Sequence, residues 1–365
     1  MKKNILLIVF CIFIAKFSFS QDDKPAGKVS GQFFMDYYYN AVRDTGIASL
    51  PNTASKGAEG VHGLQVRRIY LTYDYKFNSS LSSKFRLESD EANFTSNLAG
   101  DKANKFGMFI KDAFIKWNYT GSHELYLGLQ GTPAYEISEG FWGNRYVEKT
   151  IMDLRGIHPS RDLGLSLRGG LDSAGVFKYW FMYANGTPSL PEGDKYKRYA
   201  LSLEFNLIKD LGLTLFGEYL NKSEIDDAFN ADKKVSNNTI NSAVFLGYKK
   251  KDKINCGVEA YYRITQNGNE FETNYEDKNG MGLSVFATYH ISPKFNIYAR
   301  YDKFEPNMHA DKDGDTRNLI IAGIAVKPNE KLIVSPNLFF ETYEKDGDVE
   351  IKNSITPRLT FSWGF

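Results

Sequence analysis

Hydrophobic and polar residues alternate with a period of two along most of the chain. The final stretch, SITPRLTFSWGF, is the clearest case, with apolar residues at every second position from Ile355 to Phe365. Successive side chains of a β-strand point to opposite faces, so this pattern predicts a strand with one apolar and one polar face. An edge strand of a soluble sandwich shows the same pattern. The number of such strands therefore has to decide between the two.

The alternating pattern recurs in sixteen segments, with no change of composition that would mark a domain boundary. The predicted strands are 28–40, 64–77, 81–90, 107–119, 123–131, 162–171, 175–184, 197–207, 211–221, 239–250, 253–265, 280–291, 294–304, 317–327, 331–343 and 354–365. Tight turns such as 78–80 alternate with long polar connections such as 41–63. An even strand number with short turns at one end and long loops at the other is typical of membrane barrels. We therefore predict an all-β fold, a transmembrane antiparallel β-barrel of about 16 strands over residues 21–365.

The chain stops on an aromatic residue inside the last predicted strand. An open strand edge in hydrocarbon would leave backbone groups unpaired, so the last strand is expected to close against the first. This end resembles that of outer-membrane barrels as a class, in which a final Phe is the recognition signal for assembly. The resemblance makes Phe365 the assembly signal. It also implies the barrel assembly machinery and outer-membrane lipids as partners.

Composition and the N-terminus agree with an exported barrel. Aromatic residues make up 15% of the chain although the mean hydropathy is −0.40, and no apolar run beyond the N-terminus approaches a helical membrane span. The basic start Met1–Lys3, the apolar run Ile5–Ala15 and the small residue Ser20 predict a signal peptide over 1–20, cleaved near Ser20/Gln21. We expect a location in the outer membrane of a Gram-negative-type bacterium.

Charge and cysteine content exclude several other classes. Loss of 1–20, with its three lysines and no acidic residue, changes the formal net charge from +1 to −2. This balance gives no electrostatic case for a nucleic-acid partner. Cys256 would be the one cysteine left, so no internal disulfide is expected.

A closed barrel of this width encloses water, because side chains cannot fill it. The predicted inward-facing cations are Arg68, Lys84, Arg86, Lys116, Arg168, Lys178, Arg198, Arg263, Arg300 and Arg358. The predicted inward-facing carboxylates are Asp74, Glu88, Asp90, Asp112, Glu124, Glu204, Glu218, Glu259, Asp302 and Glu341. Because the ten cations are matched by ten carboxylates, we predict a weak ion preference. The main wall candidates are Arg68, Lys84, Arg86, Lys116, Arg168 and Arg300; the alternative is that such residues only solvate the wall and pair with neighbours.

The longest connection, 131–161, holds Phe141, Trp142 and Ile151, and is too apolar for a loop in water. We expect it either to cap the mouth or to fold inward as a third loop that narrows the channel. The candidate residues of the constriction are Arg145, Lys149, Arg155, Arg161 and Glu148. The alternative is that these charges pair with one another and with the wall.

The segment 65–170 resembles the phosphate-selective porin O and P family. The matching motifs, in order, are Arg67-Arg68, Asp112-Ala113-Phe114, Gly131-Thr132-Pro133, Glu148-Lys149 and Arg161-Asp162-Leu163-Gly164. The resemblance implies a trimeric channel of sixteen strands whose third loop forms the constriction. Anion-selective members have a one-sided basic ladder, whereas the lumen predicted here is balanced.

Enzyme chemistry finds no support in the sequence. Its five histidines are scattered without metal-ligand spacing, and the segment 311–315 lacks the glycine position and closing Glu of a calcium loop. We expect no enzyme activity, metal or cofactor. The sequence favours a homotrimeric porin for passive diffusion of small hydrophilic solutes or ions, including anions such as phosphate. The alternative is the non-conducting barrel of a secretion or adhesion assembly.

Overall fold

A computed structural model describes most of the predicted barrel. The described residues are 24–47, 57–90, 107–187, 190, 192–230, 232–312, 314–345 and 350–365. The predicted signal peptide, 1–20, and its cleavage position lie outside them, so both stay predictions.

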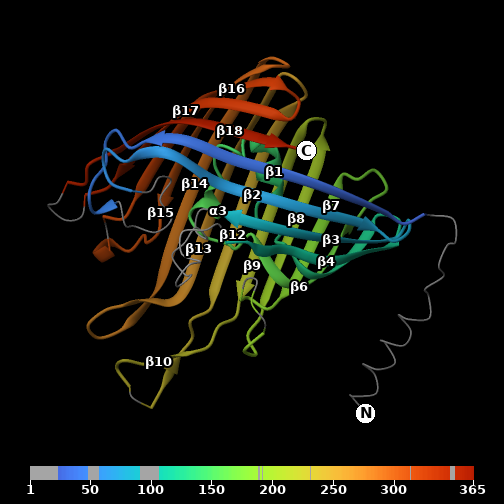
Figure 1. Ribbon diagram of the computed structural model, residues 1–365. Coiled ribbons are helices and arrows are strands. Elements are labelled where there is room, and N and C mark those ends of the chain that lie inside the picture. Colours follow the sequence, from blue (N-terminus) through green and yellow to red (C-terminus); the bar gives the residue numbers. More distant parts are fainter. Residues whose placement is uncertain are drawn as a thin grey trace, which may run out of the picture.

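Sixteen long antiparallel strands of the described chain form a closed barrel (Figure 1). They are β1 (Ala26–Tyr39), β2 (His62–Lys76), β3 (Leu81–Asp90), β4 (Phe109–Thr120), β5 (His123–Gly131), β6 (Arg161–Gly170), β7 (Phe177–Ala184), β8 (Arg198–Ile208), β9 (Leu211–Leu220), β12 (Thr239–Lys250), β13 (Ile254–Glu270), β14 (Tyr275–Ser292), β15 (Phe295–Glu305), β16 (Arg317–Asn329), β17 (Leu332–Tyr343) and β18 (Ser354–Gly364). Each pairs with its neighbours in the chain, and β1 pairs with β18 to close the sheet. The predicted barrel and its strand number are confirmed.

One hairpin is longer than the sequence pattern predicts. The segment 266–279, expected to be a loop, is largely a continuation of β13 and β14, in which Asn269 pairs with Glu276 and Glu270 with Tyr275. Its polar residues carry no apolar alternation, so the pattern did not reveal the pairing. This hairpin lies at the long-loop end, as does the small hairpin of β10 (Ile225–Asp226) and β11 (Lys234–Val235).

The faces of the strands sort as the alternation predicts. On β14, Val285 and Tyr289 are exposed on the outer surface, whereas Phe286 and Thr288 are buried inside the barrel. An apolar outer band is what a barrel in lipid requires. None of the described helices is long and apolar enough to cross a bilayer.

Two of the register shifts between strands turn an extra charged residue toward the barrel interior. Phe34 pairs with Arg68 but Met35 pairs with Val66, which leaves Arg67 as an extra residue on β2. A second register shift, between β3 and β4, leaves Lys111 as an extra residue. Arg67, Arg68 and Lys111 are consequently all buried in the barrel interior. A strict period-two assignment cannot place adjacent residues on the same face.

The seam between β1 and β18 ends in a close contact between Gly31 and the ring of Phe365. Gly31 and Phe365 exchange two backbone hydrogen bonds of 3.1 and 3.3 Å. A Cβ built on Gly31 would lie 2.2 Å from the Phe365 ring, so the ring covers a site that only glycine leaves open. Next to this pair, Phe33 stacks on Trp363 with ring centres 4.1 Å apart. The terminal residue is therefore held by the strand with which the barrel closes.

Candidate functional site

The third loop, residues 132–160, folds into the barrel as predicted. It contains two short helices, α2 (Glu136–Trp142) and α3 (Ile151–Leu154). Gly143 ends α2 with a left-handed backbone conformation, φ +67°, which turns the chain across the interior. Trp142, Ile151 and Met152 have no exposed surface. The apolar residues that made this segment unsuitable for water are thus packed inside the barrel.

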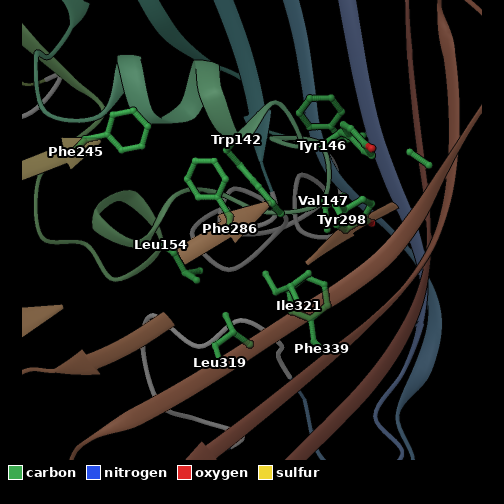
Figure 2. Packing of buried hydrophobic residues seen from close by; sticks show 12 residues of the cluster. Trp142, Tyr146, Val147, Leu154, Phe245, Phe286, Tyr298, Leu319, Ile321 and Phe339 are labelled. Atoms are coloured by element: carbon green, nitrogen blue, oxygen red, sulfur yellow. The ribbon is translucent and has the colours of Figure 1, made fainter. Parts of the chain in front are cut away.

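Trp142, Tyr146, Val147 and Leu154 pack on the inner wall formed by β12 and β14–β17 (Figure 2). Ile151 and Met152 belong to a second buried cluster, which includes residues of β7, β8 and β9. Trp142 contacts Phe286 and Tyr298 edge to face, with ring centres 5.4 and 5.9 Å apart. Leu319 and Ile321 of β16 belong to the same buried cluster. Strand β16 is apolar on both faces, because one face lies on the outer surface of the barrel and the other packs in the cluster with the third loop.

Hydrogen bonds of both its side chains and its backbone attach the loop to the wall. Asn144 Nδ2 donates to Thr288 Oγ1 of β14 over 2.8 Å, and Arg300 Nη1 donates to the carbonyl oxygen of Lys149. Arg67, from the bulge of β2, donates to the carbonyl oxygen of Tyr146. The loop is held from both sides of the barrel, by β2 as well as by β14 and β15.

Glu148 belongs to this buried attachment. Its carboxylate lies 3.5 Å from Arg67 and 3.9 Å from Arg358, while Arg67 Nε also meets Asp36 at 2.6 Å. Burial would raise the pKa of Glu148, but the two guanidinium groups outweigh it and hold the pKa below its usual value. Of the constriction candidates, Glu148 is thus a charged anchor on the wall side.

Arg155 is also an anchor. Its side chain has no exposed surface, and its Nη2 lies 2.6 Å from Glu341 Oε1 of β17. The guanidinium also lies over the ring of Phe304, 5.2 Å from the ring centre. It has no surface to offer a passing ion, unlike the part-exposed charges of the same loop.

A third buried cluster holds the end of the loop. His158 Nδ1 contacts Glu218 Oε2 of β9, and Arg198 of β8 bridges Glu218 at 2.6 Å and Asp162 at 2.8 Å. Burial lowers the pKa of His158 despite the neighbouring carboxylate. Sequence reasoning named neither His158 nor Asp162 as a site residue, and Asp162 entered it only as part of the motif Arg161-Asp162-Leu163-Gly164.

The opposite side of the loop carries part-exposed charges. Arg145 bridges Glu139 at 2.8 Å and Asp153 at 3.2 Å, and Lys149 lies 3.6 Å from Asp153. Burial would raise the pKa of Asp153, but Lys149 and Arg145 hold it below its usual value. Arg145 and Lys149 are therefore constriction candidates whose charges reach water.

The wall facing these charges comprises β2–β6. Asp112 of β4 lies between Arg161, with which it forms a close ion pair, and Arg86 at 3.4 Å. Deeper in the same wall, Glu88 joins Arg68 at 3.0 Å and Lys111 at 2.5 Å. In both groups two cations share one carboxylate.

The remaining wall candidates differ in setting. Lys84 pairs with Asp74 at 3.5 Å and Lys116 with Glu124 at 2.9 Å, both part-exposed. Arg300 is buried with Asp302 beneath the third loop. Arg168 is part-exposed and lies 3.9 Å from Glu136 of α2.

The structure thus separates the charged residues into buried pairs and part-exposed groups, which the even count from the sequence does not distinguish. Around the open side of the loop, five part-exposed cations share four carboxylates. The cations are Arg86, Arg145, Lys149, Arg161 and Arg168, and the carboxylates are Asp112, Glu136, Glu139 and Asp153. The site has a single positive charge in excess, close to the even balance counted from the sequence.

Space remains beside the loop toward the short turns. A cavity of about 550 Å³ is lined by residues of β1–β5 that include Lys84, Lys116 and Tyr126. Another of about 380 Å³ lies under α2 and includes Arg168 and Trp180. Among the described residues, no group of three or more His, Cys, Asp or Glu is placed to hold a metal ion.

Neither a family model nor a curated protein sequence matches this chain. Solved outer-membrane structures do match over nearly the whole chain. The outer-membrane channel DcaP of Acinetobacter baumannii has a TM-score of 0.64 at 12% identity, covering 95% of this chain and 99% of that one. The anion-selective porin of Comamonas acidovorans has a TM-score of 0.62 at 12% identity, covering 94% and 100%. OmpT of Vibrio cholerae, with loop L8 deleted, has a TM-score of 0.60 at 16% identity, covering 94% and 100%.

At these identities the likeness is one of fold. It places the chain among structures with the closed barrel of outer-membrane porins, consistent with sixteen strands and an inward third loop. The finer resemblance to the phosphate-selective O and P family gains no family-model match.

Proposed function

We propose that the protein is an outer-membrane porin, a water-filled channel for passive diffusion of small hydrophilic solutes or ions. The observation that carries the proposal is that the third loop, although attached to the wall at several places, keeps part-exposed charges on one face. Its apolar side chains pack on β12 and β14–β17 and on β7–β9, whereas Arg145 and Lys149 stay part-exposed opposite Arg86 and Arg161. A constriction lined by charged groups in a wide barrel suits hydrated solutes rather than apolar ones.

The charges at this constriction support a weak preference for anions. Carboxylates shared between two cations leave guanidinium and ammonium donors facing water, and these bind phosphate or carboxylate groups well. The motif resemblance to phosphate-selective porins points the same way. One excess charge makes the expected selectivity mild.

Assembly and location follow from the same proposal. We expect the barrel in outer-membrane lipid, inserted by the barrel assembly machinery that reads Phe365, and associated as a homotrimer. One of the matched Vibrio cholerae structures is described as a trimer form.

A specific observation keeps the alternative open. The third loop crosses the interior and buries Trp142 and Met152 completely, which is also what a sealed barrel would require. A non-conducting barrel of a secretion or adhesion assembly is the second candidate. It predicts no ion current.

Conductance in planar lipid bilayers separates the two. The porin should give steady open channels with slight anion preference, and removal of 138–149 should raise the conductance. Lys149→Glu turns five cations and four carboxylates into four and five, and should reverse the preference. Lys233→Glu, in an exposed outer loop, is the matched control and should leave selectivity unchanged. A wild-type barrel without current would overturn the porin, and equal effects of both reversals would place the constriction elsewhere.

A further inference from the structure

The cavity of about 380 Å³ under α2 contains an arginine held in an unusual setting. The guanidinium carbon of Arg168 lies 3.3 Å from the ring centre of Trp180 and 4.0 Å from that of Tyr126. Stacking on aromatic faces fixes the plane of a guanidinium and leaves its edge available for hydrogen bonds. Arg168 is thus pre-organised before any partner arrives.

Few protein groups pair with the charge of the Arg168 guanidinium. Among the described residues, the carboxylate within ion-pair distance is Glu136, at 3.9 Å and strongly exposed. The buried Nε of Arg168 has no hydrogen-bond partner there, nor has the indole Nε1 of Trp180, which lines the same cavity. Two buried donor groups beside one cavity favour a ligand that brings acceptor atoms.

The other charged residues that line the cavity already have protein partners, including Asp172, whose carboxylate accepts backbone hydrogen bonds from Val176 and Phe177. Lys178 lies 3.3 Å from Glu204, and Glu124 accepts hydrogen bonds from Lys116 and Tyr126 at 2.9 and 2.7 Å. The carboxylates are therefore satisfied by protein donors. Of the described charged residues that line this cavity, Arg168 is therefore the one that can still donate hydrogen bonds to a ligand.

The rest of the lining includes apolar surface. Ile137 of α2 and Trp180 line a space of about 380 Å³, within the range of small-molecule sites. A fully hydrated inorganic anion gains nothing from these groups, whereas the hydrocarbon body of an organic acid can pack on them. Carboxylate and guanidinium also match in geometry, since the guanidinium donates two parallel hydrogen bonds to the two carboxylate oxygens.

We propose that this cavity is a binding site for small organic carboxylates with an apolar body, in which Arg168 binds the carboxylate and Ile137 and Trp180 contact the hydrocarbon. The inference deepens the proposed channel function by naming a class of solute. Only the role of the site in transport rests on the proposed channel function. Binding itself does not, because binding to the folded barrel can be measured without any current.

Isothermal titration calorimetry of the detergent-folded barrel tests the site, with benzoate, acetate and inorganic phosphate as probes. Benzoate should bind more tightly than either of the others. Arg168→Gln should weaken benzoate about tenfold or more, the loss expected for a hydrogen bond to a charged group. Lys178→Gln, which removes a paired cation of the same cavity, is the matched control and should change the affinity less than about twofold.

A second variant guards against misfolding of the first. Ile137→Asn should weaken benzoate while leaving acetate binding unchanged, because it removes apolar contact and no charge. Equal benzoate affinity in the wild type and Arg168→Gln would overturn the proposal, as would phosphate binding as tight as benzoate. Benzoate binding without ion conductance would uphold this site and refute the porin function.

Discussion

Arg155→Ala tests whether the third loop is locked by its buried ion pair. The Arg155 side chain has no exposed surface, and its partner Glu341 is buried to nearly the same degree at 2.6 Å. Removing one member of such a pair leaves an unpaired buried charge, at a cost of about 3–5 kcal/mol. The hydroxyl of Tyr343 also donates to Glu341 over 3.0 Å, which offsets part of the loss. We therefore expect about 3 kcal/mol, the lower end of that range.

The loss should appear as local opening of the loop. The amides of Leu154, Arg155 and Ile157 donate backbone hydrogen bonds of 2.8–2.9 Å within and after α3, so their exchange with solvent reports on this segment. A change of about 3 kcal/mol corresponds to roughly 100-fold faster exchange. Hydrogen-exchange mass spectrometry of peptides that cover 150–157 measures it.

The double variant Arg155→Met with Glu341→Leu is the control. It removes both charges and keeps apolar volume, so it should restore most of the protection. Unchanged exchange in Arg155→Ala would refute the reasoning, because it would mean that the apolar cluster alone holds the loop. A double variant as labile as the single one would show that the lost contact was packing and not charge.

Two further predictions concern other parts of the barrel. Gly31→Val should lower the yield of heat-modifiable barrel, because its side chain would displace the Phe365 ring. Gly217→Ala, at a strand glycine with open space around it, is the control and should leave the yield unchanged. A normal yield of Gly31→Val would show that the seam contact is not needed for assembly. Between β15 and β16, burial and a hydrogen bond with Glu305 raise the pKa of Asp315 from 3.8 to about 6. The folded loop then holds a proton that the unfolded chain releases, so its stability should fall as pH rises from about 4 through 6. Exchange of this segment, corrected for intrinsic rates, should be faster at pH 7.5 than at pH 5, and Asp315→Asn should abolish the difference. A difference that persists in Asp315→Asn would assign the titration to another group.

Local pattern was sufficient for the barrel itself. Alternation, turn length and the apolar third loop are properties of neighbouring residues, and they predicted the sixteen strands and the inward fold. The hairpin of β13 and β14 was missed because its outer part carries polar residues on both faces, so its pairing depends on backbone hydrogen bonds that leave no side-chain pattern.

The roles of the charged residues were decided by tertiary structure. Period two could not place Arg67 and Lys111, since a bulge turns an extra residue inward. Nor could it distinguish Arg145, which stays part-exposed, from Arg155, which is paired with Glu341 186 positions away. The physical reason is that a charge is classified by what surrounds it. Those surroundings exist only once the third loop has crossed the barrel and its apolar residues have packed on the inner wall.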